Sequence, residues 1–163
     1  MKKILIASDH AGFEMKKELI SYLKDHGYEV EDFGAHTYDR EDDYPDFIGP
    51  LAKAIGDNPE LKGIILGGSG QGEAICANRF KGVRAVVFNG PTANHLTIES
   101  TGKQYNEVKL SRQHNNSNVI SLGVRFLFID EIVEAVEMWL GTAFSGEERH
   151  SRRIAKIDAI SNY

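Results

Sequence analysis

An apolar run that stops at a glycine-rich loop is the feature that most restricts how this chain can fold. Residues 64–66 are apolar, residues 67–73 read Gly-Gly-Ser-Gly-Gln-Gly-Glu, and a helical pattern follows from 74 to 80. This order predicts a buried strand, a tight loop and the start of a helix. Such a loop turns several main-chain N–H groups toward one point, where an anion or a developing oxyanion can bind. Because a glutamate there can act as a general base, we expect chemistry on a small anionic substrate.

The composition limits the class of protein. The chain has 163 residues, of which 41% are apolar and 26% charged, as expected for one globular domain spanning 1–163. The net charge of -5 argues against nucleic acid as a partner. Apolar runs are too short for a membrane span, and the first residues do not resemble a signal peptide. The single cysteine, Cys76, excludes an internal disulfide, so we expect a cytoplasmic protein.

Short apolar segments alternate with segments of helical periodicity along the chain. The expected strands cover residues 3–8, 28–33, 62–66, 83–88 and 118–122. Helices are expected at 12–26, from 44 onward, at 73–80, at 130–140 and at 147–160. This alternation predicts an α/β fold, a parallel sheet with helices on both faces, whose ligands bind at the carboxyl ends of the strands. Between 91 and 110 the pattern weakens, and we expect a short helix at 92–100 and a turn at 101–103.

Asp9 and His10 follow the first strand, at the expected ligand-binding edge. Asp9 can assist proton transfer, and His10 can hydrogen-bond a phosphate or a hydroxyl group. The alternative is structural, with Asp9 capping the first helix and His10 simply exposed. The sequence leaves these two interpretations open.

A basic cluster near the C-terminus is a second candidate anion site. Arg149 and Arg153 are four residues apart, so they share one face of a helix and suit a phosphate dianion. The alternative is a solvated basic helix, covering residues 149–153, whose positive side chains pair with Glu147 and Glu148. His114, in a polar segment before the last expected strand, is either an acid/base group or an exposed loop residue.

Other reactive residues carry weaker signals. Cys76 lies inside an expected helix and is best interpreted as a small packed side chain rather than a nucleophile. No cysteine and histidine spacing suggests a zinc site. A metal site built from Asp9, His10, Glu73 and His114 is conceivable, but no ligand spacing supports it, so we expect neither a metal nor another cofactor.

Taken together, the motifs resemble one family. They are Ser8-Asp9-His10-Ala11-Gly12, Asp43-Tyr44-Pro45, the loop 67–72, Ala77-Asn78-Arg79, Ser111-Arg112-Gln113-His114-Asn115, and Arg149-His150 with Arg153. In this order they resemble the ribose-5-phosphate isomerase B family, which also includes galactose-6-phosphate isomerases. The resemblance implies a Rossmann-like three-layer α/β/α sandwich with a five-stranded parallel sheet. It also implies a metal-free aldose–ketose isomerase, a homodimer or dimer of dimers, and active sites shared between subunits.

The resemblance also implies roles for individual residues. The loop, with Ser69, Gly68, Gly70 and Gly72, would hold the enediolate. Many family members carry a catalytic cysteine where this chain has Gly67, so the chain resembles the subgroup in which a glutamate, here Glu73, is the base. Asp9, Tyr44 and His114 would open the sugar ring, and Asn115 would contact substrate from the partner. The phosphate ligands would be His10, Arg149 and Arg153, joined by Arg125.

Three further expectations follow. Burial should raise the pKa of Glu73 once substrate closes the site. Compared with typical members, residues 92–109 look like an insertion, ahead of a C-terminal helix at 145–163, and this insertion leaves the choice of sugar open. The reaction is expected to interconvert ribose 5-phosphate and ribulose 5-phosphate. The alternatives are a hexose-6-phosphate isomerase acting on allose or galactose 6-phosphate, a non-catalytic phosphosugar-binding module, and, more remotely, a serine hydrolase.

Overall fold

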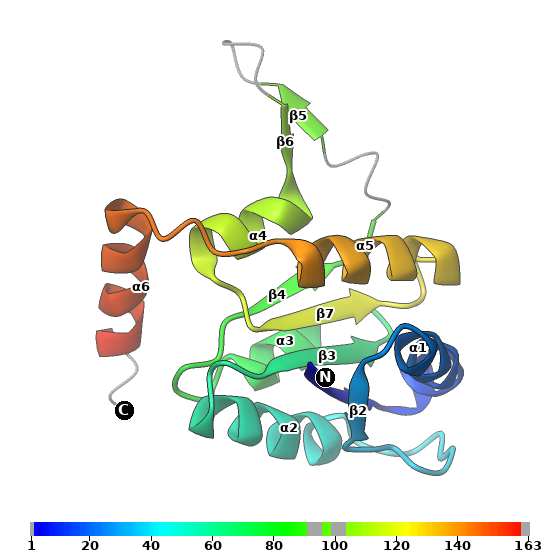
Figure 1. The fold of residues 1–163 in the computed structure, drawn as a ribbon. Helices are drawn as coiled ribbons and strands as arrows, with labels where there is room; N and C mark the ends of the chain where they lie inside the picture. The colour runs from blue at the N-terminus through cyan, green and yellow to red at the C-terminus, as the bar shows by residue number, and fades with distance from the viewer. Residues whose placement is uncertain (1, 91–95, 99–103, 161–163) are drawn as a thin grey trace.

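Five parallel strands form the centre of the molecule. We analysed a computed structural model, which describes residues 2–90, 96–98 and 104–160. The strands are β1 (Lys3–Ser8), β2 (Glu29–Asp32), β3 (Lys62–Gly67), β4 (Ala85–Phe88) and β7 (Val119–Gly123). They lie in the order β2-β1-β3-β7-β4, and every neighbouring pair is parallel (Figure 1). The predicted five-stranded parallel sheet is therefore confirmed.

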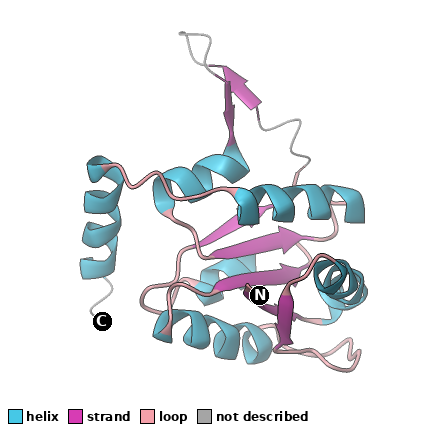
Figure 2. Ribbon diagram, in the orientation of Figure 1, coloured by secondary structure: helices cyan, strands magenta, loops and turns pink. Residues whose placement is uncertain are grey.

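Helices cover both faces of this sheet. One face carries α1 (Phe13–Asp25), α4 (Glu107–Asn115) and α5 (Ile129–Gly141), and the other carries α2 (Pro45–Asp57) and α3 (Gln71–Ala77). A short 3-10 helix, η1 (His10–Gly12), joins β1 to α1. Figure 2 shows the resulting three layers, as predicted. The last helix, α6 (Glu148–Ile160), stands beside the sandwich and contacts α4.

Burial on both faces explains why the central strands are continuously apolar. In β1, Ile4 and Ile6 join the core beneath α1 and α5, whereas Leu5 and Ala7 join the core beneath α2. Side chains alternate between the two faces of a strand, so every position along β1 meets a helix layer. Each fully buried aliphatic side chain contributes about 1.5–3 kcal/mol to the free energy of unfolding.

The region between β4 and β7 differs from its predicted structure. Leu96–Ile98 forms strand β5, which pairs antiparallel with β6 (Gln104–Asn106), so the predicted helix at 92–100 is wrong for residues 96–98. The rest of that helix and the turn at 101–103 lie outside the described residues. The next helix, α4, was not predicted. Its first turn is capped by the Asn106 side chain, which accepts the Lys109 N–H at 3.1 Å.

The parallel arrangement brings several loops to one edge of the sheet. Ser8 pairs in register with Leu66, and Gly67 with Gly123, so β1, β3 and β7 end side by side. The loops after these strands are the predicted ligand-binding edge. The loop at 33–44, after β2, is tied to the same edge. There the Ser8 N–H donates to the Gly34 carbonyl at 2.7 Å, and the Ala35 N–H donates to the Ser8 carbonyl at 2.6 Å.

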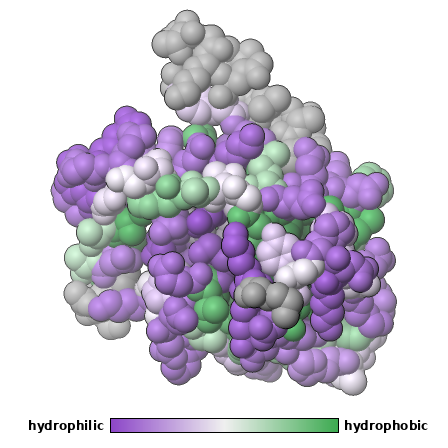
Figure 3. Space-filling model, viewed as in Figure 1, coloured by the Kyte–Doolittle hydropathy of each residue, from purple (hydrophilic) through white to green (hydrophobic). Residues whose placement is uncertain are grey.

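Hydrophilic side chains cover most of the face drawn in Figure 3, and apolar ones form small separate groups. Within residues 2–90, 96–98 and 104–160, no helix combines the length and the apolar character that a membrane crossing requires.

A substitution at Gly12 tests how closely η1 packs on the sheet. A Cβ on Gly12 would lie 2.7 Å from Leu66 Cβ and 2.9 Å from the Leu66 carbonyl oxygen, in rigid surroundings. We expect Gly12→Ala to lower the free energy of unfolding by about 1–3 kcal/mol because the core is overpacked. Gly141→Ala is the matched control, since a Cβ there meets nothing within 4 Å. Equal stability of the two variants in urea unfolding would contradict this packing argument.

Candidate active site

The glycine-rich loop lies between β3 and α3 and is held against β7. Gly70 has a φ of +75°, in the left-handed region that glycine adopts without strain. Its carbonyl accepts the Ser121 hydroxyl at 2.6 Å, and a Cβ on Gly70 would lie 3.2 Å from the Gly123 nitrogen. Within the loop, Ser69 Oγ accepts the Gln71 N–H at 3.3 Å. The loop is therefore pre-shaped by the end of a neighbouring strand.

Glu73 lies directly over Gly67. A Cβ on Gly67 would fall 1.8 Å from Glu73 Oε1, so the carboxyl group occupies the space that any larger side chain at 67 would take. Glu73 is only 5% exposed. Burial raises the pKa of Glu73 above its ordinary value, and nearby Asp9 raises it further. A hydrogen bond to the main chain of Glu73 and the charge of Arg125 oppose the shift. The pKa of Glu73 is therefore raised in the folded chain, as a general base acting near neutral pH would require.

Two further predicted residues flank the loop, each against a glycine. A Cβ on Gly72 would lie 3.0 Å from the Tyr44 hydroxyl oxygen, and a Cβ on Gly68 would lie 3.0 Å from Arg125 Cζ. The glycines thus allow a phenol and a guanidinium group to approach the main chain closely. Tyr44 comes from the start of α2, and Arg125 from the loop after β7.

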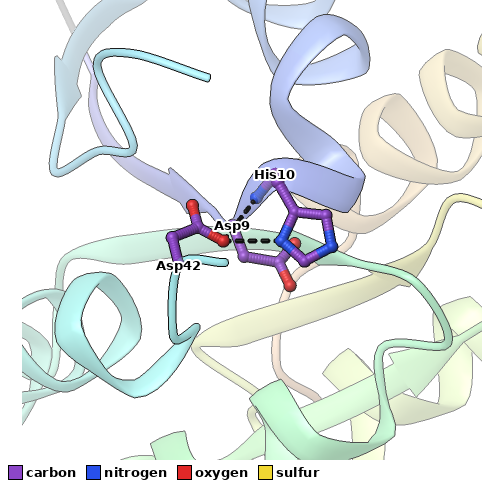
Figure 4. Close-up of side chains that lie close together, drawn as sticks. All are labelled: Asp9, His10 and Asp42. Carbon is purple, nitrogen blue, oxygen red and sulfur yellow. Dashed lines mark hydrogen bonds and ion pairs between the residues drawn. The ribbon is translucent and has the colours of Figure 1, made fainter. Parts of the chain in front are cut away.

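Asp9 and His10 follow β1 at the same edge (Figure 4). Asp9 Oδ1 accepts the N–H groups of Ala11 at 3.0 Å and Gly12 at 3.4 Å, so Asp9 caps η1. The structural alternative for Asp9 is therefore confirmed. It does not exclude a chemical role, since the charge of Asp9 also acts on Glu73.

Asp42 is a member of this site that sequence reasoning missed. Its Oδ1 lies 2.6 Å from His10 Nδ1 and accepts the His10 main-chain N–H at 3.1 Å, across 32 positions in sequence. Asp9, His10 and Asp42 each offer a ligand atom, and these atoms lie within 4.8 Å of one another. Oδ1 of Asp9, Oδ1 of Asp42 and Nδ1 of His10 each already take part in a hydrogen bond within the chain.

The remaining predicted residues form a second group on α4 and α6. The His114 ring stacks on the His150 ring, with centroids 4.2 Å apart and planes 12° apart. His150 is buried, its Nε2 has no hydrogen-bond partner among the described residues, and its pKa is lowered by burial and by the nearby charges of His114 and Arg149. Arg149 pairs with Glu147 at 2.9 Å and Arg152 pairs with Glu148 at 2.6 Å, which confirms the predicted alternative pairing within this single chain.

These two groups lie at opposite ends of the sheet. Helix α4 ends at Asn115, just before β7 begins, whereas the glycine loop and Arg125 lie beyond the carboxyl ends of β3 and β7. In Figure 1 the arrowheads of β3 and β7 point away from α6 and from the end of α4. One chain therefore brings together Asp9, His10, Tyr44, the loop with Glu73, and Arg125. It does not bring His114, Asn115, Arg149 or Arg153 to them.

Comparison with known proteins identifies the family. The family model described as Ribose/Galactose Isomerase matches residues 4–157. The chain belongs to the ribose/galactose isomerase family. It is 36% identical over 162 residues to "Ribose-5-phosphate isomerase B" of Mycolicibacterium paratuberculosis, covering 99% of this chain and 91% of the relative. It is 36% identical over 160 residues to the Escherichia coli protein of the same name, covering 98% and 97%.

A solved structure supports this assignment to the ribose/galactose isomerase family. Ribose-5-phosphate isomerase B from Mycoplasma genitalium, solved with bound ribulose-5-phosphate, superposes with a TM-score of 0.84 at 35% identity, covering 97% of this chain and 95% of that one. The Clostridium thermocellum ribose-5-phosphate isomerase B gives a TM-score of 0.82 at 37% identity, covering 97% and 96%.

The surroundings of Cys76 do not support a chemical role for this residue in this member of the isomerase family. Its side chain is partly buried and packs against the core beneath α2 and α3. Burial, with a smaller effect of Glu73, raises the pKa of the Cys76 thiol, which disfavours the reactive thiolate. The packing interpretation made from the sequence therefore agrees with its environment.

The raised pKa of Glu73 has a measurable consequence for stability. Between the ordinary value of 4.5 and the higher folded value, the folded isomerase chain binds the proton more tightly, so stability falls as pH rises. We expect Glu73→Gln to raise the melting temperature at pH 7, because the amide is buried without a charge. The gain should disappear near pH 4, where the folded wild-type chain already carries the proton. Thermal unfolding from pH 4 to 8 measures it. A lower melting temperature of Glu73→Gln than of the wild type at pH 7 would contradict the upward direction of the Glu73 pKa shift.

Proposed function

We propose that this chain interconverts ribose 5-phosphate and ribulose 5-phosphate by an enediolate proton transfer, with Glu73 as the base. The observation that carries the proposal is the buried Glu73 carboxyl group, with its raised pKa, beside a loop of main-chain N–H groups. The full-length similarity to ribose-5-phosphate isomerases B, one of them solved with ribulose-5-phosphate, supports the choice of sugar.

The reaction begins with opening of the furanose ring. His114 of a partner subunit, together with Asp9 or Tyr44, moves a proton from the C1 hydroxyl to the ring oxygen and frees the aldehyde. Asp9 and Tyr44 border the Glu73 loop in one chain, which suits a sugar placed beside the Glu73 carboxyl group. Asn115 of the partner subunit would hold a sugar hydroxyl.

Proton transfer then takes place at the loop. Glu73 removes the C2 proton, the electron pair moves to the carbonyl oxygen, and a cis-enediolate forms. A proton moves from the C2 hydroxyl to the C1 oxygen, and the same carboxyl group delivers the carbon-bound proton to C1, giving the ketose. Main-chain N–H groups around Gly68, Ser69, Gly70 and Gly72 would bind the enediolate oxygens. Removing one such donor typically raises the activation free energy by about 2.7–4 kcal/mol.

Phosphate binding positions the sugar without taking part in the proton transfer. We assign His10 and Arg125 of one chain, with Arg149 and Arg153 of its partner, as phosphate ligands. Guanidinium groups suit a dianion because their forked N–H groups bind two oxygens at once. These contacts are the same before and during proton transfer, so their loss should weaken binding more than turnover.

This assignment requires a homodimer, alone or within a tetramer. The two groups of site residues lie at opposite ends of one chain's sheet, and a two-fold axis can place one end of each chain beside the other end of its partner. We interpret residues 92–109, a range whose last three residues begin α4, as an insertion relative to typical family members. We place the reaction in the cytoplasm, as expected from the single cysteine.

The direct test is to incubate the purified protein with ribose 5-phosphate and EDTA and to measure ketopentose. We expect turnover that EDTA does not reduce. Allose 6-phosphate and galactose 6-phosphate, in the same coupled assay, test the hexose alternative. Binding of ribose 5-phosphate without turnover would instead support a non-catalytic phosphosugar-binding module.

Two substitutions test Glu73 as the base. Glu73→Gln should lower kcat by about 10²–10⁴-fold while leaving phosphosugar affinity nearly unchanged, because a general base contributes that much. Gly67→Ala should also lower kcat, since its methyl group would occupy the position of the Glu73 carboxyl oxygen, 1.8 Å away. Gly141→Ala, in open space, is the control. Wild-type turnover by Glu73→Gln would eliminate Glu73 as the base.

Mixing two inactive variants tests the shared site. In a dimer of Glu73→Gln with His114→Ala, one of the two sites takes both intact residues and the other takes neither. We expect a randomly mixed 1:1 sample to recover about a quarter of wild-type activity, because half the dimers are mixed and half of their sites are intact. Absence of recovery after subunit exchange, verified by native mass spectrometry, would show that each chain uses its own His114.

A further inference from the structure

Asp42 carries a buried carboxylate that makes two hydrogen bonds to His10. We propose that Asp42 is a positioning residue, which holds the His10 ring so that Nε2 is presented to the phosphate of the substrate. This inference rests on the proposed function, in which His10 is a phosphate ligand. The inference adds Asp42 to the site, although neither the neighbouring residues in sequence nor a recognisable motif marked Asp42 as functional.

The geometry fixes the ring at two points. Asp42 Oδ1 accepts the His10 main-chain N–H at 3.1 Å and lies 2.6 Å from His10 Nδ1 (Figure 4). One oxygen thus binds both the main chain and the side chain of the same residue. This double contact sets the side-chain torsions of His10, in addition to locating the residue. The Tyr38 ring, edge-on to the imidazole at 6.5 Å, borders the ring as well.

Fixing Nδ1 determines what the rest of the ring can do. Once Nδ1–H is donated to Asp42, Nε2 is the only polar atom of the ring left for a ligand. The His10 side chain is 27% exposed, whereas that of Asp42 is 8% exposed, so the ring reaches solvent and the carboxylate does not. A phosphate oxygen needs a hydrogen-bond donor at Nε2. A ring that donates from both nitrogens is the imidazolium, and Asp42 is then its ion-pair partner.

The carboxylate has no competing structural task among the described residues. Asp42 Oδ2 is buried and has no hydrogen-bond partner there. The loop that carries Asp42 is anchored separately, by the two main-chain bonds that join Gly34 and Ala35 to Ser8. Keeping a buried carboxylate with one unused oxygen is costly unless its charge serves another group. His10 is the group that it contacts.

Kinetics of three variants test the proposal. Asp42→Ala removes both hydrogen bonds, so the KM for ribose 5-phosphate and the inhibition constant of inorganic phosphate should rise roughly tenfold, with kcat changed less than about twofold. Asp42→Asn keeps an oxygen that accepts both N–H groups but loses the charge, and should give a smaller rise. Glu41→Gln is the control, because it removes the same negative charge from an exposed position in the same loop. Its KM and inhibition constant should match those of the wild type.

A double-mutant cycle separates positioning from general damage. If Asp42 acts through His10, Asp42→Ala should raise KM no further in a chain that already carries His10→Ala. ¹⁵N NMR of the histidine rings supplies a second readout. In the wild type with bound inorganic phosphate, His10 should show hydrogens on both nitrogens, and Asp42→Asn should shift the Nδ1 signal. This measurement also serves if Asp42→Ala does not fold.

Several results would overturn the inference. An unchanged KM in Asp42→Ala, an equal further rise in the His10→Ala background, or a fall in kcat at constant KM would each do so. The inference about Asp42 is also overturned if the wild type turns over substrate and His10→Ala has the same KM as the wild type. That result would leave the isomerase activity intact. Absence of turnover by the wild type would instead refute the proposed function, so the two failures are distinguishable.

Discussion

The contact between Glu73 and Gly67 is the constraint on which the rest of the site depends. A carboxyl group can lie over the end of β3 only because residue 67 has no side chain, since a Cβ there would overlap Oε1 at 1.8 Å. Packed in this position, the carboxyl group is taken out of water, and its pKa rises. The same burial that destabilises the folded chain at neutral pH would make Glu73 a better base for the proposed proton transfer, a trade-off common at active sites.

The parallel sheet determines which residues can meet within one chain. Strands β1, β3 and β7 end in register, so the loops that follow them place Asp9, Glu73 and Arg125 at one edge. Helix α4 must return the chain to the opposite edge before β7 begins, and it carries His114 there. The proposed site needs Glu73 and His114 together, so it would depend on two chains, and assembly would then be a condition for activity.

The fold was predictable where burial leaves a local signal, and the site where the end of a strand or a family motif marked its residues. Apolar runs at residues 3–8 and 62–66 predicted β1 and β3 because both faces of these strands are covered. Helix α4 was missed, although Asn106 caps it and Asn116, with a φ of 44°, ends it, because few apolar residues mark its buried face. Asp42 gave no signal, since its contact with His10 spans 32 positions and lies in an acidic segment that looks solvated.

The loop at 33–44 brings distant segments of the chain together at the candidate site. Its first residues pair with Ser8 at the end of β1, Asp42 then reaches His10, and Tyr44 begins α2 against Gly72. One segment thus positions His10 and Tyr44, the proposed phosphate ligand and ring-opening group, relative to the loop that carries Glu73. Because α2 is packed on the sheet through buried Ile48 and Leu51, the position of Tyr44 is set by the core. Rigid support of this kind is what precise placement of reacting groups requires.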